Sequence, residues 1–113
     1  MADEGREYIT PEIDKRRQRR AQLITEVKCE ALNRDEFLVT RDVSAGGLFV
    51  STKNPLPLKS EVRVAFSLAT GSAAISCRGR VVYSMQGLGM GIQFADLSED
   101  GRSALEKFVD EAN

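Results

Sequence analysis

The sequence predicts an all-β-dominated fold, a six-stranded antiparallel β-barrel preceded by a flexible basic N-terminal arm and followed by a C-terminal α-helix. Short segments alternate apolar and polar residues, turn-forming residues separate them, and the period becomes helical only near the end. With 113 residues, the chain fits one domain that can bury a core without disulfide or metal support. Strands this short and this regularly spaced favour a closed or nearly closed barrel.

The arm is predicted from the composition of residues 1–14, which mix both charges without an apolar period. We therefore expect a flexible segment there and a single domain over residues 15–113. The first residues lack the apolar centre of a secretory signal, and no stretch approaches the roughly 18 apolar residues of a membrane span. The expectation is a cytoplasmic protein that does not contact membranes.

The strands are read from an alternation with a period of two. In the first strand, Leu23, Val27 and Cys29 share one face, while Glu26 and Lys28 share the other, which indicates one face in water. Tyr83 is expected on the inner face of the fifth strand, and the phenylalanines in the core. The predicted strands cover residues 23–32, 37–43, 48–50, 61–68, 75–84 and 88–94.

The C-terminal segment carries a helical stripe that includes Leu97, Leu105 and Val109. Ser98 is a suitable N-cap, because its side-chain oxygen can accept a hydrogen bond from the first helical turn. We expect this helix to cover an open edge or an open end of the sheet.

The two cysteines, Cys29 and Cys77, occupy apolar positions of predicted strands, which favours two buried, reduced thiols over a disulfide. The chain has no histidine and no C-x-x-C pair, so we expect no metal site. It also lacks a nucleophile with a base at a recognisable spacing. The prediction is a protein that is not an enzyme and uses no cofactor.

Basic residues are concentrated in residues 15–20, Lys-Arg-Arg-Gln-Arg-Arg, and without these five the net charge of −1 becomes −6. Guanidinium groups four residues apart, such as Arg16 and Arg20, can hold one small anion from two sides through bidentate bonds. A solvated basic run or a nucleic-acid-binding arm is the alternative. The acidic remainder of the chain disfavours nucleic acid, because it repels phosphate.

A second candidate site is the segment Asp42-Val-Ser44-Ala-Gly46-Gly47 between two predicted strands. A carboxylate can accept both donors on the edge of guanine, and adenine offers no such pair. The glycines allow a close approach of backbone or a positive φ. An ordinary tight turn, with Asp and Ser bonded to nearby backbone, explains the same residues.

Taken together, Arg16-x-x-x-Arg20 before the first strand and Asp42-x-Ser44-x-x-Gly47 after the second strand resemble the PilZ domain family. The late strand that ends at Phe94 and the terminal helix fit as well. PilZ domains are bacterial receptors for cyclic di-GMP. The resemblance implies that Arg16 and Arg20 bind phosphate and stack on guanine, that Asp42 and Ser44 bind the guanine edge, and that Gly47 is the close-approach position.

Neighbouring residues extend this expected ligand site. Arg17 and Gly46 are included in it, whereas the sequence leaves open whether Arg19, Arg78 or Arg80 touches the ligand. The predicted function is a cyclic di-GMP receptor in which the ligand orders the arm and so creates a surface for a downstream protein. We expect a monomer or a weak homodimer. The alternatives are a protein-interaction module that binds no nucleotide and a small nucleic-acid-binding barrel.

Overall fold

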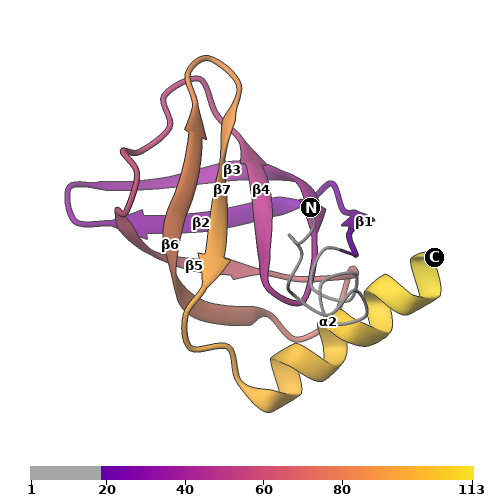
Figure 1. Ribbon diagram of the computed structural model, residues 1–113. Helices are drawn as coiled ribbons and strands as arrows, with labels where there is room; N and C mark the ends of the chain where they lie inside the picture. Colours follow the sequence, from indigo (N-terminus) through magenta and orange to yellow (C-terminus); the bar gives the residue numbers. More distant parts are fainter. Residues whose placement is uncertain (1–18) are drawn as a thin grey trace, which may run out of the picture.

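The computed structural model describes residues 19–113, which form a closed six-stranded antiparallel barrel with one C-terminal helix (Figure 1). Hydrogen-bonded neighbours follow the order β3-β2-β5-β6-β7-β4, and a further pairing of β3 with β4 closes the ring. The predicted fold class is confirmed, while the predicted arm of residues 1–14 and the domain start at residue 15 lie outside the described residues. The barrel strands are β2 (Glu26–Ala31), β3 (Arg34–Val43), β4 (Gly47–Ser51), β5 (Glu61–Phe66), β6 (Ile75–Met85) and β7 (Gly89–Phe94).

The predicted first strand is wrong in its N-terminal part, because the chain breaks there into two strands. A short strand, β1 (Ala21–Gln22), precedes β2 and pairs with the far end of β3. At the break, the Thr40 hydroxyl donates to the Leu23 carbonyl, and the Thr25 N–H donates to the same hydroxyl at 3.0 Å. The buried Thr40 side chain thus takes the place of backbone hydrogen bonds that a continuous strand would form here. β3 also begins earlier than predicted, at Arg34.

The barrel interior collects one face of each strand, as the alternation predicted. Cys29 and Cys77 both lie in this core and are free thiols. Both are in register with Val64 on the intervening strand, so two strand spacings, about 10 Å, separate their Cα atoms, which is too far for a disulfide. Burial raises the pKa of Cys29 to about 12 and that of Cys77 to about 11. The prediction of two buried, reduced cysteines is confirmed.

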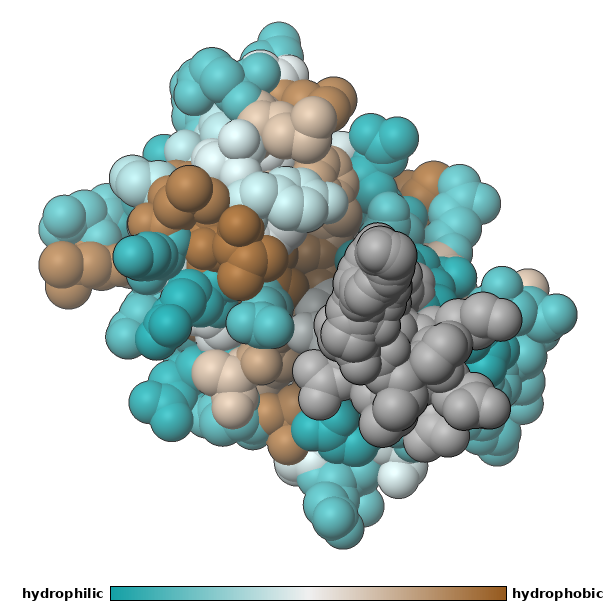
Figure 2. All heavy atoms as spheres, in the orientation of Figure 1, coloured by the Kyte–Doolittle hydropathy of each residue, from teal (hydrophilic) through white to brown (hydrophobic). Residues whose placement is uncertain are grey.

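Two aromatic residues predicted in the core are instead on the surface. Tyr83 is 49% exposed, because a register shift between Val81 and Tyr83 rotates the end of β6. Phe37, on the outer face of β3, is 63% exposed. Exposed apolar residues also occur along β6 and the turn to β7, among them Val82, Met85 and Leu88. Apolar side chains lie between polar ones on this side of the molecule (Figure 2).

The helix α2 (Glu99–Ala112) lies against one end of the barrel, near β1 (Figure 1). Ser98 caps it as predicted, accepting a hydrogen bond from the Gly101 N–H at 3.0 Å. Leu105 and Val109 are buried, and Leu105 belongs to the barrel core. The helix covers an end rather than an edge, since a closed barrel has no edge strand. Within residues 19–113, no helix is long and apolar enough to cross a membrane.

Candidate functional site

The bulge in β3 sets the direction of the Asp42 side chain. Strand β3 pairs with β4 through Thr40 opposite Val50 and then Asp42 opposite Phe49, so Arg41 is the extra residue. Thr40 and Val43 are fully buried, and the two residues between them both face outward. Bulges re-aim side chains in this way. Asp42 therefore points away from the core, toward the segment that precedes β1.

Arg20 reaches Asp42 because β1 runs antiparallel to the end of β3. Ala21 pairs with Val43 and Gln22 with Asp42, and continuing this register sets Arg20 opposite Ser44. The Arg20 Nε donates to the Asp42 carboxylate in an ion pair, and its Nη1 donates to the Ser44 Oγ at 3.4 Å. The structure thus brings together three of the predicted site residues.

The turn between β3 and β4 is held by Ser44. The Ser44 N–H donates to the Gly47 carbonyl at 2.8 Å, and the Gly46 N–H donates to the Ser44 Oγ at 3.2 Å. Ser44 is 1% exposed. Its hydroxyl therefore serves the turn as well as Arg20, as the interpretation of this segment as a tight turn predicted.

The two glycines of the turn have different surroundings, and neither has a positive φ. A Cβ on Gly47 would collide with the carbonyl oxygen of Ile92 in β7. A Cβ on Gly46 would meet only the Ser44 Oγ, at 3.9 Å. Gly47 therefore allows strand β7 to pass close to the turn. The space beside Gly46 is open.

An open cleft of about 560 Å³ lies beside this turn. The Ser44–Gly47 turn and Arg20 form one wall, and β7 with the end of β6 forms the floor. Arg102 and Glu106 of α2, with Ala95 and Leu97 of the segment before the helix, complete the lining. Asp42 does not line the cleft and lies behind Arg20. The cleft residues outside the turn are Arg20, Leu48, Val82, Tyr83, Gly91, Ile92, Gln93, Phe94, Ala95, Leu97, Arg102 and Glu106.

An aromatic surface forms part of the cleft floor. The Tyr83 ring lies over Gly91, where a Cβ would come within 3.1 Å of the ring. Tyr83 also contacts Phe49, with ring centroids 5.8 Å apart, and remains 49% exposed. An exposed aromatic face of this kind can stack on a planar base.

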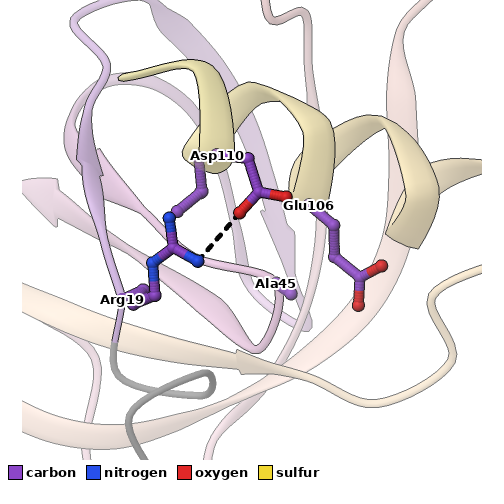
Figure 3. Close-up of a pocket in the computed structure, with 5 residues that line it drawn as sticks. Arg19, Ala45, Glu106 and Asp110 are labelled. Carbon is purple, nitrogen blue, oxygen red and sulfur yellow. Dashed lines mark ion pairs between the residues drawn. The ribbon is translucent and has the colours of Figure 1, made fainter. Parts of the chain in front are cut away.

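Arg19 contacts helix α2 and does not line the cleft. Its Nη1 forms an ion pair with the Asp110 carboxylate at 2.9 Å, above a smaller hollow of about 280 Å³ that Ala45 also borders (Figure 3). In the same view, the Glu106 side chain extends away from this ion pair (Figure 3). Adjacent arginines therefore have different partners.

Arg78 and Arg80 lie on the outer face of β6 and do not line the cleft. The Arg78 guanidinium pairs with Asp96 at 2.9 Å. The backbone N–H of Arg78, together with its side chain, holds the pKa of the Asp96 carboxyl below its usual value. Arg80 is in register with Gln93, which does line the cleft.

The predicted site is therefore assembled in part. Arg20, Ser44, Gly46 and Gly47 border one cleft, while Arg16 and Arg17 lie outside the described residues. Among residues 19–113, no group of three or more acidic or thiol side chains is placed to hold a metal ion. Four polar or aromatic cleft residues were missed by the sequence analysis: Tyr83, Gln93, Arg102 and Glu106. Arg102 and Glu106 are four residues apart in the predicted helix and therefore share one face, which the sequence alone could have indicated.

Comparison with protein-family models matches residues 14–111 to the PilZ domain. The chain belongs to the PilZ domain family. PilZ domains are a family of cyclic di-GMP receptors, and they are in general binding domains rather than enzymes. A comparison with curated proteins finds no matching relative.

Solved structures share the fold of this PilZ domain. One is the Bacillus subtilis inhibitor of motility (MotI/DgrA), with a TM-score of 0.72 and 17% identity over 85% of this chain and 50% of that one. Another is the PilZ domain of CeSA from a cellulose-synthesizing bacterium, with a TM-score of 0.60 and 20% identity over 81% of this chain and 95% of that one. The chain thus spans about half the length of MotI/DgrA.

Proposed function

We propose that this PilZ domain is a receptor that binds cyclic di-GMP in the cleft beside the Ser44–Gly47 turn and does not act as an enzyme. One observation carries the proposal. Arg20 lines the cleft while it is bonded to Asp42 and Ser44, so the described parts of both sequence motifs meet at one wall. A guanidinium there can bind a phosphate oxygen or stack on a guanine face.

The Arg20–Asp42 pair suggests how the guanine is selected. In the free protein, the Asp42 carboxylate is occupied by Arg20. When a phosphate group takes over the guanidinium, Asp42 is released and can accept hydrogen bonds from N1–H and the N2 amine of guanine. Adenine presents no such pair of donors, so the same carboxylate disfavours it. Arg16 and Arg17 would add positive charge that attracts the phosphates.

The output that we propose is a ligand-induced ordering of the N-terminal arm. Clustered positive charges repel one another, and a dianion would neutralise them and draw the arm over the cleft. The resulting surface would bind a downstream protein in the cytoplasm, with the domain acting as a monomer or weak homodimer. MotI/DgrA is described as an inhibitor of motility, which is consistent with an effector acting on another protein. Hydrogen exchange over residues 1–22 should slow when the ligand is added, and unchanged exchange would overturn this mechanism.

Calorimetric titration tests the proposed receptor directly. We expect saturable binding of cyclic di-GMP and none of cyclic di-AMP or GTP at the same concentrations. Absence of binding to all three would contradict the proposal and favour a PilZ-like protein-interaction module. Binding to RNA or DNA that weakens steeply with salt would instead indicate a nucleic-acid-binding barrel.

A further inference from the structure

Helix α2 presents a row of charged residues to the candidate site. Arg102, Glu106 and Asp110 follow one another at intervals of four residues, which places them along one helix face. Arg102 and Glu106 line the cleft, and Asp110 binds Arg19 at the adjoining hollow. None of these three residues belongs to the Arg-x-x-x-Arg motif or to the Asp-x-Ser-x-x-Gly motif.

The two cleft residues of this row have opposite charges and face the same space as Arg20. No ion pair joins Arg102 or Glu106 to another residue within the described part of the chain, although the two are one helical turn apart. Both side chains are exposed. Both charges are therefore available to a ligand that enters the cleft.

We infer that α2 forms a second, charge-tuning wall of the ligand site, in which Arg102 attracts the phosphates of the bound dinucleotide and Glu106 opposes them. This inference rests on the proposed function, since it assigns roles toward the same ligand. The α2 residues would then modulate the affinity, while Arg20 and Asp42 bind and select the ligand. Removing the Arg102 charge should weaken binding, and removing the Glu106 charge should strengthen it.

The test uses neutral substitutions on the full chain and calorimetry with cyclic di-GMP. Arg102→Gln should raise Kd about threefold, and Glu106→Gln should lower it by a similar factor, as expected for partly solvated charge pairs. Both effects should shrink as the salt concentration rises, because exposed charges are screened. Circular dichroism checks that each variant keeps its helix.

Lys107→Gln and Glu111→Gln are the matched controls. These residues form another exposed pair four apart on the same helix and do not line the cleft, so the same charge changes there should leave Kd unaltered. If the parent protein binds while the substitutions at Arg102 and Glu106 have no effect, or match their controls, only this inference fails. If the parent protein shows no binding, the proposed function fails and the inference fails with it.

Discussion

The Arg20 guanidinium and the Asp42 carboxylate form an ion pair that joins the segment before β1 to the bulged end of β3. Their side chains are 41% and 39% exposed, so water screens the attraction. Exposed pairs of this kind typically contribute less than about 1 kcal/mol to the free energy of unfolding. The main consequence of the pair is therefore positional, because it holds a guanidinium at the cleft.

Substitution of Arg20 should separate binding from stability. In Arg20→Ala, we expect the free energy of unfolding to fall by less than about 1 kcal/mol, because the lost pair is exposed. Affinity for cyclic di-GMP should fall tenfold or more, since a charge-assisted hydrogen bond contributes about 1.5–3 kcal/mol. Urea unfolding and calorimetry measure the two quantities. An unchanged Kd would remove Arg20 from the ligand site.

Thr40 is expected to be the more important residue for stability. Its buried hydroxyl bonds the Leu23 carbonyl and the Thr25 N–H at the break between β1 and β2. Thr40→Val keeps the shape of the side chain and leaves both backbone groups without this partner, which should cost about 1–3 kcal/mol. Thr52→Val, at a half-buried loop position, is the control. Equal unfolding midpoints in urea for Thr40→Val and the parent would contradict this role.

The same break shows what the sequence could not predict. The alternation of Val27 and Cys29 predicted β2 correctly, but Leu23 continues the same pattern although the chain has left the strand. The motif spacing predicted that Arg20, Asp42 and Ser44 belong together, and their contacts agree with it.

The β-bulges and the packing of α2 account for the other features of the site that the sequence analysis did not predict. A single extra residue before Asp42, and another before Tyr83, moves the side chains beyond it to the opposite face of the strand, and a period of two contains no sign of this change. Arg102 and Glu106 were missed for a different reason. Their helical stripe is visible in the sequence, but only the packing of α2 on the barrel places them at the cleft.

The two glycines of the turn should respond differently to alanine. Gly47→Ala forces a methyl group against the Ile92 carbonyl and should destabilise the barrel by about 1–3 kcal/mol, as overpacking does. Gly46→Ala has open space and a permitted φ, so its stability should stay within about 0.5 kcal/mol of the parent. Thermal unfolding distinguishes them. Equal losses would show that the collision at Gly47 is relieved by movement of β7.

The buried thiols predict a loss of stability at alkaline pH. The pKa of Cys29 is raised to about 12 and that of Cys77 to about 11, compared with 9.0 for a free thiol. Well below pH 9 both states keep the protons, so these groups add no pH dependence. As the pH approaches and passes 9, the unfolded chain releases protons that the folded chain retains, and the free energy of unfolding should fall toward pH 11.

Urea unfolding between pH 8 and pH 11 measures this loss. Replacing both cysteines, as in Cys29→Ala with Cys77→Ala, should flatten the alkaline part of the profile while lowering the overall stability, because small cavities form. A thiol reagent at pH 8 should label neither cysteine in the folded parent and both in urea. Rapid labelling of the folded protein would contradict their burial.

The neighbouring arginines Arg19 and Arg20 should differ sharply in their effect on ligand binding. Arg19 is paired with Asp110 at 2.9 Å on the helix side, and only Arg20 lines the main cleft. Arg19→Ala removes the same charge from the same basic segment, so it controls for long-range attraction of the dianion. We expect its Kd to rise no more than about twofold, against tenfold or more for Arg20→Ala.

Ionic strength makes this comparison decisive. A general electrostatic effect of the basic segment would be equal for both variants and would disappear at high salt, because charges more than about 10 Å apart are screened at 0.1 M. A direct contact of Arg20 with the ligand would persist under those conditions. If both variants lost affinity equally and only at low salt, the arginines would act as a diffuse positive charge, and the pairing of Arg20 with Asp42 would have no part in selecting guanine.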